Sequence, residues 1–131
     1  MGEKKTPSAD AWLREAKADA AAAGCGMFLL HNGVVRRSAK AKARGGDESA
    51  PDVRGMRFSC DREKAAAAVR AAEAMEGIAF VRVWLAEGEL AVGDDIMYVL
   101  VGGDIRPHVI DALQTLVGTL KNECVTEEEL T

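Results

Sequence analysis

The stretch GELAVGDDIMYVLVGGDIRP, Gly88–Pro107, decides how the second half of this chain folds. Two runs that carry apolar residues, Gly88–Ala91 and residues 95–103, flank a turn at Val92-Gly93-Asp94. Two such runs around a short glycine-containing turn predict a β-hairpin. Pro107 suits the first turn of a helix, where a missing N–H group costs no hydrogen bond, so we expect a helix directly after the hairpin.

That helix is predicted over the segment RPHVIDALQTLVGTLKNEC, residues 106–124. Apolar residues recur in it at helical spacing, which predicts a single buried stripe. The stripe consists of Ile110, Leu113, Leu116, Val117 and Leu120. The last seven residues, VTEEELT (125–131), are predicted to form an acidic tail.

Two more helices are predicted upstream of the hairpin. Residues 9–23 are rich in strong helix formers, and Ser8 or Asp10 can cap their N-terminal end. Residues 61–76 form the second, with Asp61 as the N-cap and Gly77 as the residue that ends it.

Strands are predicted between these helices and after the second of them. They cover residues 27–36, 53–60 and 78–88, where apolar and β-branched residues gather. Within the first strand, Asn32-Gly33 indicates either a tight turn or a bulge.

The segment RRSAKAKARGGDESAPD, residues 36–52, lacks apolar periodicity and is basic first, then glycine-rich and acidic. Residues 37–52 are therefore predicted to form a mobile surface loop. The functional alternative is a flexible basic lid over an anionic ligand. Residues 1–8 are polar and predicted to be flexible.

The order of elements predicts an α+β fold in which helices pack on a mainly antiparallel sheet. A chain of 131 residues is expected to form a single domain, residues 1–131. A net charge of −4 and an aromatic content of 5% argue against nucleic-acid binding. No apolar run is long enough to span a membrane, and no secretory signal pattern opens the chain.

The three cysteines form no C-x-x-C pair, which disfavours a disulfide framework and a zinc site and favours a reduced, cytoplasmic protein. No P-loop, nucleotide-binding or metalloprotease motif occurs, so no metal and no cofactor are expected.

Arginines supply the candidate binding site. Arg106 stands at the start of the last helix, where free backbone N–H groups favour an anion. Arg36 and Arg37 end the first strand, so they could converge with Arg106 on one phosphate or carboxylate. Surface salt bridges are the simpler alternative for these arginines. His108, in the first turn of the same helix, is a further candidate. The simpler interpretation is that its side chain is exposed to solvent.

Three segments carry a resemblance to a known family. GMFLLHNGVVR (26–36), FVRVWLAEGELAVGDDIMYVLVGG (80–103) and IRPHVIDALQTLVGTLK (105–121) together resemble the large, catalytic subunit of molybdopterin synthase. The resemblance covers roughly residues 10–130 and rests on the order and spacing of the segments. It implies an α/β hammerhead-like α+β fold, a homodimer, and a small ubiquitin-like sulfur carrier as a partner.

The resemblance also implies an activity, in which the carrier's C-terminal thiocarboxylate delivers two sulfurs to cyclic pyranopterin monophosphate. Arginines of the family hold the substrate phosphate. Of these, Arg36 matches the last position of a G-K-V-R motif, and Arg106 matches the arginine of an H-R pair.

The departures from the family pattern fall on charged positions. The family's P-x-W-K-K-E motif falls on VTEEEL, which places Glu128 at the position of the catalytic lysine. Lys121 falls in a preserved L-K pair and is not the catalytic lysine in this alignment. Cys124 lies nearby as a substitute nucleophile, although nothing near it in sequence would lower its pKa.

These features lead to two functional hypotheses. The first is a divergent molybdopterin synthase large subunit, tied to molybdenum cofactor biosynthesis and without the family's usual activity. The second is a non-catalytic, dimeric binding or regulatory module for a pterin phosphate, another anion or a sulfur carrier. In either case Glu127, Glu128 and Glu129 could fold towards the arginines and compete with an anion.

Overall fold

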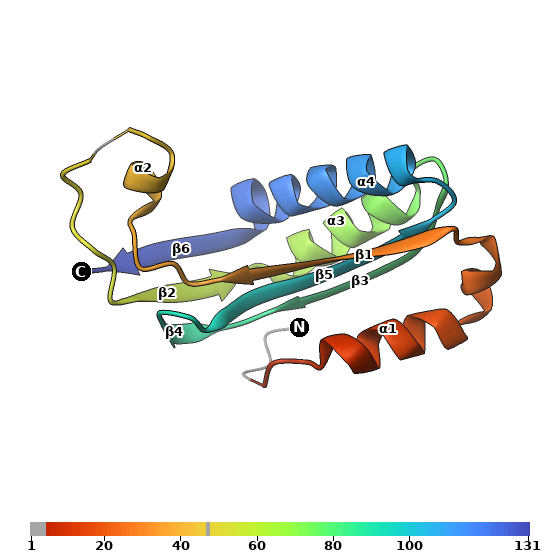
Figure 1. Ribbon diagram of the computed structural model, residues 1–131, viewed down its shortest axis with the longest axis horizontal. Helices are drawn as coiled ribbons and strands as arrows, with labels where there is room; N and C mark the ends of the chain where they lie inside the picture. The colour runs from red at the N-terminus through yellow and green to blue at the C-terminus, as the bar shows by residue number, and fades with distance from the viewer. Residues whose placement is uncertain (1–4, 47) are drawn as a thin grey trace.

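The computed structural model describes residues 5–46 and 48–131 as an α+β fold with two three-stranded antiparallel sheets (Figure 1). The fold class predicted from the sequence is confirmed, except that the strands divide between two sheets. The helical elements are α1 (Ala9–Ala18), η1 (Ala20–Gly24), α2 (Lys40–Ala43), α3 (Arg62–Glu73), α4 (Arg106–Thr119) and η2 (Leu120–Cys124). The strands are β1 (Met27–Val34), β2 (Gly55–Cys60), β3 (Ile78–Leu85), β4 (Gly88–Ala91), β5 (Asp95–Gly103) and β6 (Val125–Leu130).

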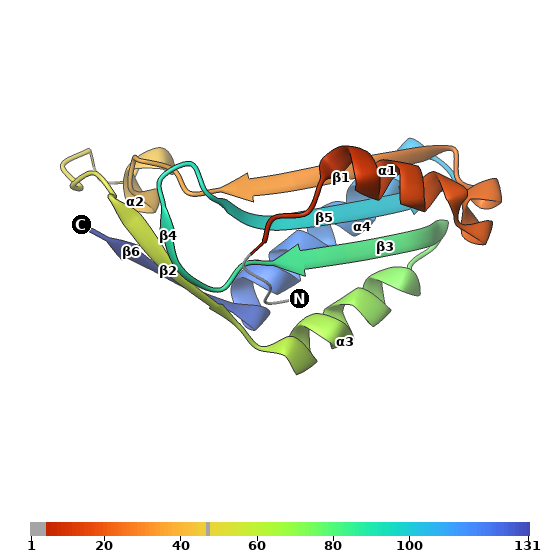
Figure 2. The ribbon, with the colours of Figure 1, turned by 90° about the horizontal axis from the view of Figure 1, so that it is seen from below.

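The larger sheet has the strand order β1-β5-β3, with β5 in the middle. Helices α3 and α4 cover one of its faces and α1 lies on the other, so that β5 is buried almost throughout (Figure 2). Met27 pairs with Gly103 and Val34 with Asp95, and the register shifts between Gly33 and Val34. That shift confirms the bulge that Asn32-Gly33 indicated, and excludes the tight turn.

The predicted hairpin around Val92-Gly93-Asp94 is wrong, because β4 and β5 belong to different sheets. The turn itself forms, with the Asp94 amide bonded to the Ala91 carbonyl at 3.0 Å and Gly93 at a φ of 92°. Val35 comes between the two strands: its amide donates to Asp94 and its carbonyl accepts from Gly93. The chain therefore leaves β4 in one sheet and enters β5 in the other.

The smaller sheet has the order β4-β2-β6. Residues 125–131, predicted as an acidic tail, instead form β6 up to Leu130, paired with β2 from Cys60↔Val125 to Gly55↔Leu130. Arg57 on β2 offsets part of the acidic charge, since its guanidinium lies 3.1 Å from both Glu89 and Glu128.

The predicted helices are present with two local differences, a break in the first helix and an earlier end of α3, which stops at Glu73 with Ala74 as its C-cap, ahead of Gly77. Asp61 caps α3 as expected, accepting from the Lys64 amide at 3.1 Å. The first helix breaks at Asp19, whose carboxylate accepts from the Ala21 amide and starts η1. Within the described residues, no helix is long and apolar enough to cross a membrane.

The buried stripe of α4 differs in part from the prediction. Leu116 and, in η2, Leu120 are buried as expected, but the start of the stripe is one residue off. Val109 and Ala112 face the core, while Ile110 is 37% exposed. The reason is that β5 and α3 together pack against the Val109 side of the helix.

Candidate functional site

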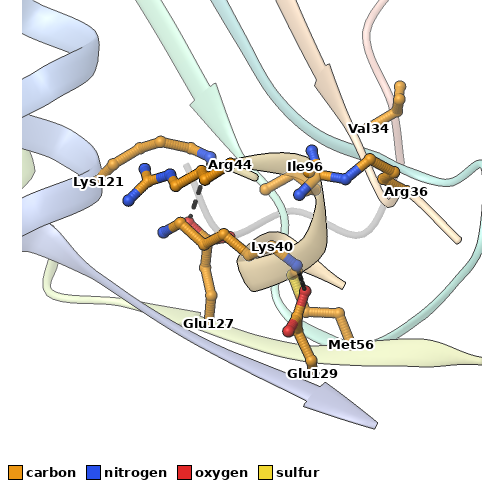
Figure 3. A pocket seen from close by; sticks show the side chains of 10 residues that line it. Val34, Arg36, Lys40, Arg44, Met56, Ile96, Lys121, Glu127 and Glu129 are labelled. Atoms are coloured by element: carbon orange, nitrogen blue, oxygen red, sulfur yellow. Dashed lines mark hydrogen bonds and ion pairs between the residues drawn. The ribbon is translucent and has the colours of Figure 1, made fainter. Parts of the chain in front are cut away.

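A pocket of about 390 Å³ lies where the C-terminal end of β1 meets β6 and the end of the last helical segment (Figure 3). Its charged residues are Arg36, Lys40, Arg44, Lys121, Glu127 and Glu129. Val34, Met56 and Ile96 add apolar surface. The volume lies within the range of small-molecule sites, near its lower end.

Four segments that are distant in sequence supply these side chains. Arg36 follows β1, and Lys40 and Arg44 come from α2 and the residue after it. Lys121 lies in η2, the π-helical turn that ends the last helix, and the two glutamates lie on β6. The segment 37–52 thus contributes two cations to the pocket; whether it is mobile stays a prediction.

The pocket carries four cationic side chains against two carboxylates. Lys121 Nζ lies 3.4 Å from Glu127 Oε1, and Glu129 Oε2 accepts from the Lys40 amide at 2.9 Å. Arg36 Nε donates to the Ser38 carbonyl at 3.0 Å, which orients its guanidinium. Within residues 5–46 and 48–131, neither Arg36 nor Arg44 forms a salt bridge. This surplus of positive charge makes the pocket attractive to an anion even though the whole chain is negative.

Of the predicted site residues, only Arg36 lines this pocket. Arg37 is exposed next to it, and its carbonyl accepts from the Val53 amide at 2.7 Å. Arg106 and His108 lie at the start of α4, which follows the opposite end of the β1–β5 pair. The two ends of β1, Met27 and Val34, are seven residue steps apart, or about 23 Å. A pocket shared by Arg36 and Arg106 of one chain is therefore contradicted by the fold.

His108 holds the start of α4 against the loop after α3. Its Nδ1 lies 2.7 Å from Asp104 Oδ1 and its Nε2 lies 2.7 Å from Glu76 Oε1. The hydrogen bond to Asp104 raises the pKa of His108, and the nearby Asp104 and Glu76 charges add to the effect. The same hydrogen bond lowers the pKa of Asp104.

We expect His108 to titrate above its ordinary pKa of 6.5. Because its folded pKa is raised, its contribution to stability is fully present below pH 6.5 and is lost as the pH rises through the folded pKa. Histidine NMR titration provides the measurement, and Glu76→Gln should lower the His108 value. His31 serves as the internal control, because burial, and then the Lys121 charge, lower its pKa. A His108 pKa at or below 6.5 would contradict the bridging role.

The sequence reading missed Lys121, Lys40 and Arg44 as pocket residues. A signal was present for Lys121, which stands just after the last apolar position of the helix, but the alignment set it aside. Glu128, which the alignment placed at the catalytic position, points away from the pocket and pairs with Arg57. Cys124 is 4% exposed and its pKa is raised by burial, which argues against a nucleophilic role.

Within the described residues, no group of three or more His, Cys, Asp or Glu side chains is placed to hold a metal ion. The groups of the pocket that can act on a ligand are instead guanidiniums, amines and carboxylates. These can bind a phosphate, donate hydrogen bonds to it and accept hydrogen bonds from a ligand's N–H groups.

Comparison with known proteins places the chain among relatives of one kind. Residues 5–123 match the family described as "MoaE protein". No curated protein matches the chain.

Solved structures share the fold. The molybdopterin biosynthesis MoaE protein from Burkholderia ambifaria superposes with a TM-score of 0.74 at 17% identity, covering 98% of this chain and 80% of that one. Molybdopterin synthase from Staphylococcus aureus gives a TM-score of 0.71 at 15% identity, covering 95% and 85%. A complex of subunits 1 and 2 of the molybdopterin-converting factor from Helicobacter pylori gives 0.65 at 13% identity, covering 94% and 78%.

Proposed function

Because this chain belongs to the MoaE protein family, we propose that it acts in molybdenum cofactor biosynthesis as a large subunit of the molybdopterin synthase type. The observation that carries the proposal is the basic pocket, in which Arg36 and Lys121 converge from β1 and η2. In this role the pocket binds the phosphate of a cyclic pyranopterin monophosphate.

In this function Lys121 is the central catalytic candidate. Its amine reaches the pocket, whereas Glu128, at the aligned lysine position, does not. A lysine amine can hold an anion, and when uncharged it can act as a nucleophile. The sulfur donor would be the C-terminal thiocarboxylate of a small sulfur-carrier partner. The two-subunit converting factor of Helicobacter pylori, which has the same fold, supports such a pairing.

The rival function is a non-catalytic module that binds a pterin phosphate or another anion. One observation favours it: Lys121 Nζ already forms an ion pair with Glu127 Oε1 at 3.4 Å, which holds the amine in its charged form. The two functions share the pocket and differ in turnover.

We further propose that the protein is a homodimer and that a second copy supplies Arg106 to the pocket of the first. Residues at opposite ends of one sheet can meet across a two-fold axis, where each end of one copy faces the other end of its partner. Exposed apolar residues at the two ends, Val34 at 48% and Ile105 at 52%, are suited to such a contact. Arg37 and His108 would then lie at the rim of the shared pocket.

The proposed function is tested with the purified protein, a pterin monophosphate and a thiocarboxylated small carrier. We expect calorimetry to detect binding of the pterin monophosphate, and we expect a dithiolene product when the carrier is added. Binding without product would favour the non-catalytic module. Absence of binding would contradict both functions.

A further inference from the structure

His31 is a partly buried titratable residue that the proposed function does not use. It lies on β1 opposite Val99 of β5, whose side chain is buried. Tyr98, the neighbour of Val99, contacts Trp12 of α1. Because neighbouring strand residues point to opposite faces, Val99 and His31 face the other layer, which α3 and α4 form. His31 therefore lies under the helices whose last turn, η2, carries Lys121.

The imidazole of His31 is directed towards the pocket end of β1. Its Nε2 lies 3.7 Å from the position that a Cβ atom of Gly33 would take. Cβ of Ile96 lies 4.0 Å from the same position. Ile96 and Val34 both line the pocket (Figure 3). Since Gly33 has no side chain, the ring nitrogen of His31 lies directly behind this part of the pocket wall.

The Nε2 atom of His31 is buried and has no hydrogen-bond partner among the described residues. A buried polar atom without a partner costs free energy of folding, so its presence calls for an explanation. A neutral imidazole carries one proton, on either of its ring nitrogens. In either tautomer the ring can accept a second proton without breaking a hydrogen bond at Nε2.

The unliganded pocket opposes that second proton. Burial lowers the pKa of His31, and the Lys121 charge lowers it further. Among the described residues, Lys121 is the one charged group that acts on this pKa. Lys121 itself pairs with Glu127 of β6. The other elements on this side present apolar residues to the core, which are Met97 and Val99 of β5 and Val109, Ala112 and Leu116 of α4.

A dianion in the pocket would reverse the electrostatic effect on His31. It would lie among the pocket cations, which include Lys121, and bring two negative charges close to the one positive charge that acts on the ring. A nearby charge of opposite sign favours the protonated imidazole. The same site that disfavours an imidazolium when empty can therefore favour it when an anion is bound.

We propose that an anion bound in the pocket draws a proton onto His31, which becomes a further cation of the site, so that anion binding is coupled to the uptake of a proton. The proton comes from the solvent and forms one N–H bond at the free ring nitrogen, and no other bond changes. His31 acts through the pocket wall and does not touch the anion. This inference rests on the anion binding of the proposed function and does not depend on turnover.

The test uses the full-length chain and sulfate, which stays a dianion over the pH range in which histidine titrates and so takes up no proton itself. NMR titration of the imidazole protons gives the pKa of His31 with and without sulfate. His108→Gln leaves His31 as the chain's only histidine and assigns its signals. Sodium chloride at equal ionic strength is the control for screening.

We expect sulfate to raise the pKa of His31, and sodium chloride at the same ionic strength to have little effect on it. Lys121→Gln should raise the pKa of His31 in the absence of sulfate, because it removes the charge that lowers it. The same variant should respond less to sulfate, because one of the groups that hold the anion is gone.

The affinity for sulfate should depend on pH in the matching direction. Because the pKa of His31 is higher in the bound state, affinity rises as the pH falls through the bound pKa, and the gain is complete below the free pKa. Calorimetry should show several-fold tighter binding at about pH 5 than at about pH 8. His31→Phe keeps a ring that cannot take up a proton, and His31→Gln keeps a polar group. Both should lose most of this pH dependence.

Three results would overturn the inference. If sulfate leaves the pKa of His31 unchanged or lowers it, the coupling is wrong while the anion pocket stands. If His31→Phe and His31→Gln weaken binding equally at both pH values, His31 has a structural role only. If the unmodified protein binds no sulfate at either pH, the anion pocket fails, and the proposed function fails with it.

Discussion

Removing Arg36 and Lys121 together should abolish detectable phosphate binding. Both side chains reach the same pocket, Arg36 from the end of β1 and Lys121 from η2. A hydrogen bond to a charged group contributes about 1.5–3 kcal/mol. Losing two such contacts therefore weakens binding by roughly 100-fold to 10,000-fold. Isothermal titration calorimetry of Arg36→Ala/Lys121→Ala against the unmodified protein measures the loss.

A second double variant distinguishes direct contact with the phosphate from the long-range effect of net charge on phosphate binding. Arg14→Ala/Lys17→Ala makes the same change in net charge on the exposed face of α1, away from the pocket. It should retain nearly the full affinity, because charges beyond about 8 Å are screened at physiological salt. Equal losses in the two double variants would mean that phosphate is held by the general field and that this pocket is not its site.

Much of the fold could be predicted because its signals are local. Asp61 marks the start of α3 in the sequence, and the apolar run of β5 is long enough to identify a buried strand. Strand partners depend on distant segments, which explains the wrong hairpin. Nothing in the sequence near the Gly93 turn indicates that Val35 will form backbone hydrogen bonds with Gly93 and Asp94. The acidic composition of β6 hid a strand, because glutamate has a low strand propensity and the pairing partner Arg57 lies about 70 residues away.

The site was predicted less well than the fold, and the reason is geometric. Lys121 lies in the π-turn η2, where the last helix widens, and the spacing of apolar residues does not reveal where that turn starts. Glu127 and Glu128 differ by one residue, yet one lines the pocket and the other faces Arg57, since neighbouring strand residues point to opposite faces. An alignment that treats this segment as a tail assigns both to the same surroundings.

Mixing two variants that each bind phosphate weakly should restore tight binding in part of the pockets if Arg106 acts across a dimer. Arg36→Ala would remove one guanidinium from each pocket, and Arg106→Ala would remove the guanidinium that the partner copy supplies. Both pure variants should therefore lose phosphate affinity by about tenfold or more. Each mixed dimer would join an intact Arg36 from one copy with an intact Arg106 from the other. One of its two pockets is then complete, while the other lacks both arginines.

The stoichiometry of the restored sites decides the matter. After subunit exchange at equal concentrations, about half of the dimers are mixed, so about a quarter of all pockets should bind phosphate with full affinity. Calorimetry gives this fraction directly, and light scattering establishes whether the dimers form. If each chain instead holds its own phosphate, Arg106→Ala alone should bind like the unmodified protein, since Arg106 lies at the far end of the sheet from Arg36. In that case mixing restores nothing in the Arg36→Ala copies, and the shared pocket is excluded.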